Sequence, residues 1–365
     1  MRQSDTVSRP AGRRNVAGDA TDVAPAPLRP VRLPRRWLAV ALAGLIVAVL
    51  LGMTVGPAGL PLRGVLVEVA NRVPGVQLDG GLDEREAAVL WQLRAPRVVL
   101  GLLVGAMLAI AGAGYQGVFR NPLADPYLLG VAAGAGLGAT FAIVSGSSRG
   151  LVPLAAFVGG VAGVAATYAL GRSVGGRSTN SLILAGVAVA AFLAAVQTYV
   201  NQRNSDSLRE VYGWILGRLL TAGWNEVLTV LPYIVVAGAV IFAHRRLLDV
   251  LSVGPDEAGT LGVPAARVRL VVVLAATLGT AAAVSVSGLI GFVGIVVPHI
   301  VRMLAGSSYR VVLPLAALVG GMFLVLSDLA ARTLVSPGEL PVGVVTAFVG
   351  APFFTLVLRS SRRPW

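Results

Sequence analysis

The chain has 365 residues, of which 56% are hydrophobic and only 13% are charged. A soluble domain carries about twice that charged fraction, so the composition excludes a soluble fold and indicates a polytopic membrane protein. Cysteine is absent, which excludes disulfides, thiolate metal sites and a cysteine nucleophile. The net charge is +13 and every basic residue is arginine. Because the arginines cluster at the ends of apolar runs, they indicate membrane orientation rather than nucleic-acid binding.

The first 36 residues differ in composition from the rest of the chain. They hold eight arginines and five prolines but few large apolar side chains. They cannot bury enough surface to fold, so we expect a disordered basic tail on the cytoplasmic side. Arg35 and Arg36 before an apolar run resemble a twin-arginine signal. That run has spanning length and no clear small-residue cleavage site follows it, which favours an uncleaved first membrane helix.

Residues 37–363 are expected to form one transmembrane domain, because uncharged apolar windows recur along them. Each window can supply one helix of about 20 residues. Window 270–301 is too long for one helix and contains Gly288 and Pro298, so it predicts two helices joined by a tight turn. The prediction is an all-α membrane protein with ten transmembrane helices. The windows are 37–56, 98–119, 127–148, 150–171, 178–202, 227–243, 270–301, 311–327 and 340–358.

The arginines predict the orientation of these helices. If the N-terminus lies inside and ten helices alternate, twenty arginines fall on the cytoplasmic side and ten outside. This is the positive-inside distribution, and it places both termini in the cytoplasm.

A short polar joint at residues 120–126 separates the second and third windows. With two prolines, an Asn and an Asp, it cannot continue either helix, and it is predicted to be a rigid cytoplasmic turn. The residues assigned to this structural loop are Arg120, Asn121, Pro122, Asp125 and Pro126.

A second pair of positions repeats the spacing that leads into this joint. Gly112 and Pro122 stand as far apart as Gly288 and Pro298. The match suggests an inverted repeat of two five-helix halves. Close packing of small residues between helices explains the same glycines, so both interpretations remain open.

Residues 245–269 form the longest polar stretch between helices, and they are predicted to be cytoplasmic. Pro255 followed by two acidic residues is typical of the first turn of a helix. Gly262 ends that helix, and Pro264 can open a second short one. Two short helices at about residues 254–269 would be either an ordered loop or a docking element for a cytoplasmic partner.

Several charged side chains are predicted on the outer face. Arg94 and Arg97 stand where the second helix begins, and interfacial anchoring explains them. Asp328 lies near the end of an apolar helix and is costly there unless it is paired. Arg332 is its natural partner at spacing (i, i+4). A proton-relay role for Asp328 is the alternative.

The remaining polar positions carry little chemistry. Thr179 and Asn180 precede the fifth helix and are typical helix caps. His299 follows Pro298 and is interpreted as a helix-entry residue rather than a ligand. The sequence shows no nucleophile–base set, no metal-ligand motif and no phosphate-binding loop, so we expect neither an enzyme nor a bound cofactor or metal.

Three blocks of sequence resemble the FecCD permease family, whose members are membrane subunits of ABC importers for iron–siderophores, haem and vitamin B12. The blocks read RNPLADPYLLGV, GLIGFVGIVVPHIVR and ELPVGVVTAFVGAPFF, and the resemblance spans about residues 90–363. It implies a type II ABC importer fold in a bacterial cytoplasmic membrane. It also implies a homodimer or a pair with a similar permease, with the pathway at the dimer interface.

The resemblance also implies roles for particular residues. Arg94, Arg97 and Arg332 would dock an extracytoplasmic substrate-binding protein. Thr179 and Asn180 would narrow the cytoplasmic gate, although Asn180 departs from the small hydroxyl of the vitamin B12 permease. ATP and Mg would be held by partner ATPase subunits. The residues that would contact the ATPase are Pro255, Asp256, Glu257, Leu261, Gly262, Val263 and Arg267.

The sequence therefore predicts a permease that translocates a ferric siderophore or a related metal chelate. Vitamin B12 and haem are the alternatives within the family. A proton-coupled secondary transporter that uses Asp328 is the alternative from another class.

Overall fold

The computed structural model describes residues 33–56, 58–148, 150–173, 179–219, 223–335 and 338–360. The predicted tail lies outside these residues, except that the first helix already begins at Arg35. The helices are α1 (Arg35–Thr54), α2 (Leu62–Ala70), α3 (Glu84–Ala88), α4 (Ala95–Phe119), α5 (Val131–Val144), α6 (Leu151–Ser173), α7 (Thr179–Arg203), α8 (Leu208–Ile215), α9 (Trp224–Ala243), α10 (Arg245–Val253), α11 (Pro255–Thr260), α12 (Ala265–Ser287), α13 (Val293–Ala305), α14 (Tyr309–Thr333) and α15 (Val342–Ser360). A π-helical turn (Val89–Arg94) and two 3₁₀ turns (Pro126–Leu129 and Ser205–Ser207) complete the described elements.

The helical fold agrees with the prediction. Among the described residues, seven helices are long and apolar enough to cross a membrane, and α5, α13 and α15 are shorter apolar helices. Each of the ten predicted spans overlaps one of these helices. Length and composition alone do not establish that all ten cross, so the number ten stays a prediction.

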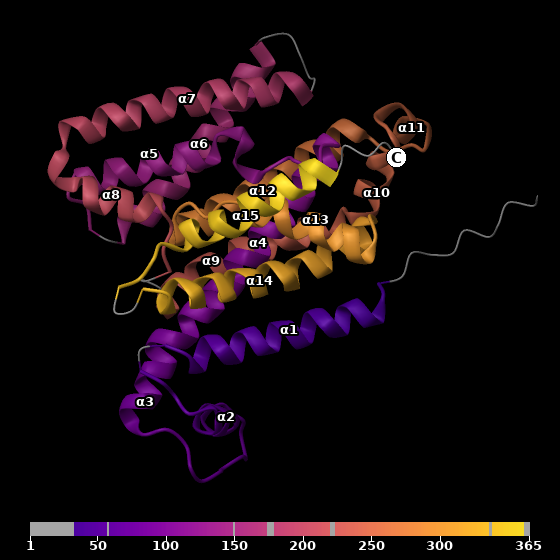
Figure 1. The fold of residues 1–365 in the computed structure, drawn as a ribbon. Coiled ribbons are helices and arrows are strands. Elements are labelled where there is room, and N and C mark those ends of the chain that lie inside the picture. The colour runs from indigo at the N-terminus through magenta and orange to yellow at the C-terminus, as the bar shows by residue number, and fades with distance from the viewer. Residues whose placement is uncertain are drawn as a thin grey trace, which may run out of the picture. The chain divides into compact units, whose positions relative to one another are not determined.

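Helix α4 forms the centre of one group of helices and packs against α14, α12, α13 and α9 (Figure 1). Small residues allow the closest approaches. A Cβ at Gly105 would collide with the carbonyl of Gly320 on α14, and a Cβ at Gly112 would collide with the carbonyl of Gly294 on α13. Helix α1 packs on α14 at the edge of this group.

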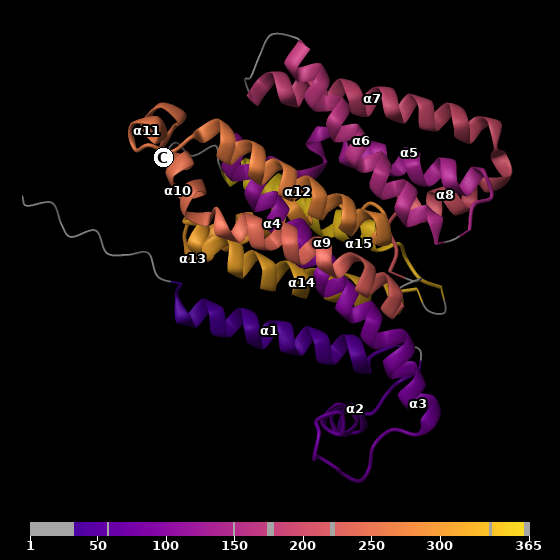
Figure 2. The same ribbon diagram turned by 180° about the vertical axis from the view of Figure 1, so that it is seen from behind.

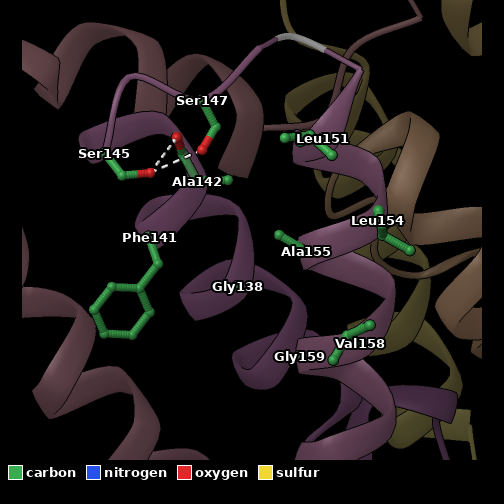
Figure 3. A pocket seen from close by; sticks show the side chains of 10 residues that line it. All are labelled: Gly138, Phe141, Ala142, Ser145, Ser147, Leu151, Leu154, Ala155, Val158 and Gly159. Atoms are coloured by element: carbon green, nitrogen blue, oxygen red, sulfur yellow. Dashed lines mark hydrogen bonds between the residues drawn. The ribbon is translucent and has the colours of Figure 1, made fainter.

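A second group consists of α5, α6, α7 and α8, and it meets the first group mainly through α6 and α12 (Figure 2). Gly134 and Gly138 on α5 lie directly against the backbone of α6. A shallow apolar groove of about 600 Å³ runs between these two helices, with Phe141, Leu154 and Val158 among its lining residues (Figure 3).

The long window 270–301 is broken as predicted. Helix α12 ends at Ser287, Gly288 adopts φ +68°, which favours glycine, and α13 begins at Val293. The interpretation of His299 as a helix-entry residue is wrong, because His299 lies inside α13 with its ring 6.0 Å from that of Phe353.

The glycine match that suggested an internal repeat has no structural counterpart. Gly112 lies in the interior of α4, whereas Gly288 ends α12. An inverted repeat stays a prediction that these two residues do not support.

The entry to the second membrane helix also differs from the prediction. Asp83 and Glu86 form a reciprocal capping box that starts α3, and the helix then continues through the π turn into α4. Arg94 and Arg97 therefore lie more than two turns inside a continuous helical segment rather than at its start.

Candidate functional site

The joint after α4 is a turn that side-chain hydrogen bonds hold, and its rigidity stays a prediction. Arg120 ends α4 in the left-handed conformation with φ 51°. The side chain of Asn121 accepts a hydrogen bond from the Leu123 N–H at 2.9 Å. The carboxylate of Asp125 accepts one from the Tyr127 N–H at 2.7 Å and so caps the 3₁₀ turn. Burial raises the pKa of Asp125 to about 6, against the opposing effect of that hydrogen bond.

The joint is attached to the turn between α12 and α13. The Tyr127 hydroxyl donates to the carbonyl oxygen of Ile290 at 2.9 Å. Pro126 lies against Gly294, where an added Cβ would come 2.8 Å from the proline Cδ. Two of the three blocks that carry the family resemblance are therefore in direct contact.

Helices α10 and α11 lie at the same end of the bundle as this joint. Leu248 of α10 reaches the last turn of α4, where it contacts Gly117. Helix α10 was not predicted, although Leu248 and Leu251, both fully buried, stand at the helical spacing of three. The charged pair Arg245 and Arg246 that opens the helix obscured this signal.

Helix α11 is the first of the two short helices predicted at residues 254–269. Ala258 is fully buried, and its carbonyl oxygen accepts a hydrogen bond from the Val263 N–H at 2.9 Å. Gly262 ends the element with φ +75°. Leu261 stands 67% exposed. The prediction of a second short helix is wrong, because Pro264 is the N-cap of the long helix α12.

The residues predicted to contact the ATPase lie on α11, in the turn that follows it and, for Arg267, in the first turn of α12. Glu257, Leu261 and Arg267 are exposed, and Val263 is half-buried against the core. The side chains of Pro255 and Asp256 lie outside the described residues. The contact itself stays a prediction.

An ionic connection that the sequence did not reveal joins α10 to α14. One carboxylate oxygen of Asp249 accepts from the Tyr309 N–H at 2.6 Å, and the other accepts from the Ser308 hydroxyl at 2.8 Å. Arg310 Nε lies 3.5 Å from the same carboxylate. Asp249 therefore caps the N-terminus of α14, where a negative charge is stabilised by the helix dipole.

At the opposite end of the bundle, Asp328 lies between two arginines. Arg332 pairs with it at 3.2 Å, which confirms the predicted (i, i+4) pair. Arg97 on α4 pairs with the same carboxylate at 2.8 Å and with Glu339 at 2.9 Å. Glu339 precedes α15, so this ionic cluster joins α4, α14 and the segment that leads into α15.

Two arginines of this end also bind the C-terminus of α1. Arg94 donates to the carbonyl oxygens of Met53 and Thr54, both at 2.8 Å, and also to that of Ala58. Arg332 donates to the carbonyl oxygen of Gly52 at 3.0 Å. The carbonyls of Gly52, Met53 and Thr54 belong to the last turn of α1, where no helical N–H follows to pair with them.

The three arginines predicted to dock a binding protein therefore lie close together, but inside the chain. Arg94 and Arg332 are only 5% exposed, and the side chain of Arg97 is 12% exposed. Docking by these residues stays a prediction. Among the charged groups of the cluster, Glu339 is the most exposed, at 26% of its side chain.

The predicted gate lies where α7 begins. Thr179 is the first residue of that helix, and the side chains of Thr179 and Asn180 lie outside the described residues. Across the part of the chain that the structure describes, no group of three or more His, Asp or Glu side chains is placed to hold a metal ion.

Known proteins share the sequence pattern and the fold of this chain. The sequence matches the FecCD transport family over residues 44–360. It is 39% identical to the cobalamin import system permease protein BtuC of Halobacterium salinarum, over 88% of this chain and 95% of that protein. It is also 39% identical to the Fe(3+)-citrate import system permease protein YfmD of Bacillus subtilis, over 76% of this chain and 83% of that protein.

A solved structure shares the arrangement of the helices. A metal-chelate type ABC transporter in an inward-facing conformation matches with a TM-score of 0.79 at 28% identity, over 90% of this chain and 100% of that one. The family match over residues 44–360 covers α4 and α10–α15, which carry the joint, the α10–α11 element and the ionic cluster. The chain belongs to the FecCD transport family and is a multi-pass membrane permease of the ABC importer type.

Proposed function

We propose that this permease carries a ferric siderophore or a related iron chelate across the cytoplasmic membrane, driven by separate ATPase subunits. The proposal that separate ATPase subunits drive transport rests on the structure of the α10–α11 element. It presents an exposed leucine, Leu261, directly after the short helix α11, whose Ala258 is buried in the core. An exposed apolar side chain beside an element anchored in the core suits the buried centre of a contact with a partner protein.

The proposed orientation puts α10–α11 in the cytoplasm and the Asp328 cluster outside, with both termini inside. The distribution of arginines supports it, with twenty on the cytoplasmic side and ten outside. Two copies of this chain, or this chain and a similar permease, would enclose the pathway. An extracytoplasmic binding protein would deliver the chelate.

Iron is proposed because one relative at 39% identity is an Fe(3+)-citrate permease. A cobalamin permease has the same identity over more of the chain, so vitamin B12 is the second candidate, with haem as a third within the family. The proton-coupled alternative is less well supported, because both arginines beside Asp328 engage its carboxylate.

Transport in proteoliposomes tests the substrate and the driving force together. The permease is reconstituted with its ATPase and binding protein and offered radiolabelled ferric hydroxamate, ferric citrate, cobalamin or haemin. We expect uptake of a ferric chelate that requires ATP and persists with an uncoupler. Uptake of cobalamin alone would move the substrate to the second candidate, and uptake that survives ATP depletion but stops with an uncoupler would contradict ATP-driven import.

Substitution of Leu261 tests the coupling contact. Leu261→Ala should weaken capture of the ATPase and reduce transport, since it removes the exposed anchor without disturbing Ala258. Leu78→Ala is the matched control, because Leu78 is 51% exposed and belongs to the segment between α2 and α3. Equal effects of the two substitutions would contradict the contact.

A further inference from the structure

Helix α2 carries an apolar stripe that no described part of the chain covers. Leu62, Leu66 and Val69 are 51%, 48% and 41% exposed, and Val73 in the following turn is 55% exposed. Residues at these spacings share one helix face. The opposite face of the helix packs against the protein, because Val65 is fully buried in a small cluster with Met53 and Leu90 among its members.

Trp91 fixes the position of α2 in the fold. The Glu68 carboxylate accepts a hydrogen bond from the Trp91 indole at 3.0 Å, and the Arg72 guanidinium lies 4.4 Å from the centroid of its ring. Trp224 donates in turn to the Trp91 carbonyl oxygen at 2.8 Å. Tryptophan is enriched at the membrane–water interface, so this pair marks the depth of α2 as that of the headgroups.

The direction of α2 agrees with that depth. Figures 1 and 2 both show α2 nearly end-on beside the end of α1, while α1 runs across the view, so α2 crosses the direction of α1 rather than running alongside it. A short helix that crosses the direction of a spanning helix at its end can lie along the membrane surface. Helix α1 itself faces lipid, since Ile46 and Val47 are 58% and 54% exposed. Helix α2 contacts α1, and Met53 in the last turn of α1 packs against the cluster that contains Val65, so the exposed stripe of α2 lies beside the end of this lipid-facing helix.

We propose that α2 is an interfacial helix that lies in the leaflet at the α3 end of the protein. Leu62, Leu66 and Val69 insert at the boundary between headgroups and acyl chains. Arg63 and Arg72 are exposed on the flanks of the stripe, where their guanidinium groups bind lipid phosphate. The bilayer is thus the partner of this face, and the helix fixes the depth of the end of α1 and of the nearby ionic cluster.

The absence of cysteine makes a direct test simple. Single-cysteine variants Leu66→Cys and Val69→Cys of the full chain are labelled with bimane in nanodiscs of phosphatidylethanolamine and phosphatidylglycerol. Ile46→Cys serves as the lipid-facing reference and Glu84→Cys, exposed on α3, as the water-facing reference. Lipids spin-labelled near the headgroup and aqueous iodide are the two quenchers. The readout requires neither ATPase nor substrate, so it is independent of the proposed function.

We expect the spin-labelled lipid to quench positions 66 and 69 at least about threefold more than position 84, and iodide to quench them less. Equal quenching of positions 66, 69 and 84 by iodide would overturn the proposal. Protection from iodide that appears only with bound binding protein would instead assign the stripe to that partner. Protection only in discs holding two copies would assign it to a dimer contact, and both results overturn the proposal.

Discussion

Replacing Asp328 by Asn separates a structural role of this carboxylate from a transport role. The side chain is 4% exposed and pairs with Arg97 at 2.8 Å and Arg332 at 3.2 Å. The amide has the same shape but no charge. Glu339 still balances Arg97, whereas Arg332 loses its ionic partner in a buried setting. Breaking a buried pair from one side costs about 3–5 kcal/mol, and the remaining pair with Glu339 favours the lower end of that range.

The expected result is a decrease in apparent Tm of about 5–10 °C in detergent or nanodiscs, with ATP-driven uptake preserved in the fraction that stays folded. Thr333→Val is the matched control, because Thr333 directly follows Arg332, is exposed and donates hydrogen bonds only within its own helix. The double variant Asp328→Asn/Arg332→Met should cost less than the sum of the single variants, since it removes both members of the pair. An unchanged Tm together with lost transport would refute the structural role and support the proton-coupled alternative.

Two further predictions concern the end that carries α10. Asp249→Ala leaves the Tyr309 N–H and the Ser308 hydroxyl without their acceptor, at a cost of about 1–3 kcal/mol. We therefore expect the variant still to capture the ATPase, while uptake per ATP hydrolysed decreases. Ser252→Ala is the control, and unchanged coupling in Asp249→Ala would contradict the connection between α10 and α14. Because burial raises the pKa of Asp125 to about 6 from its usual 3.8, the folded protein retains this proton between about pH 4 and 6 while the unfolded chain releases it, so stability decreases as pH rises through that window. Asp125→Asn retains the cap without the charge, so above pH 6 it should be more stable than the wild type by up to about 2–3 kcal/mol, an advantage that disappears toward pH 4 in melts followed by tryptophan fluorescence.

The sequence predicts well those features that depend on neighbouring residues. The two prolines and Asp125 predict the turn after α4, Gly288 predicts the break between α12 and α13, and the spacing of Asp328 and Arg332 predicts their pair. Each depends on turn chemistry or helix periodicity, which act over a few residues. The prediction of a second short helix after Gly262 was wrong, because a proline such as Pro264 is equally suited to begin a short helix or a long one.

The unpredicted features depend on contacts between distant parts of the chain. Arg97 and Asp328 are separated by 231 residues, and Asp249 and Tyr309 by 60. Hydropathy and charge counts place an arginine near a membrane surface, but they do not say which carbonyl or carboxylate it meets. For this reason Arg94 and Arg332 were predicted as surface contacts, although most of their surface is covered by the end of α1 and the ionic cluster.

The two ionic connections lie near opposite ends of one helix. Asp249 caps the N-terminus of α14, and Asp328 and Arg332 lie in its last two turns. A helix of 25 residues is about 37 Å long, enough to span the bilayer core. Because α14 is bonded to α10 at one end and to α4 and α1 at the other, it forms a continuous mechanical path between the two faces. A movement of α10–α11 would therefore reach the opposite face through α14, and weakening Asp249 should affect coupling, whereas weakening Asp328 should affect stability.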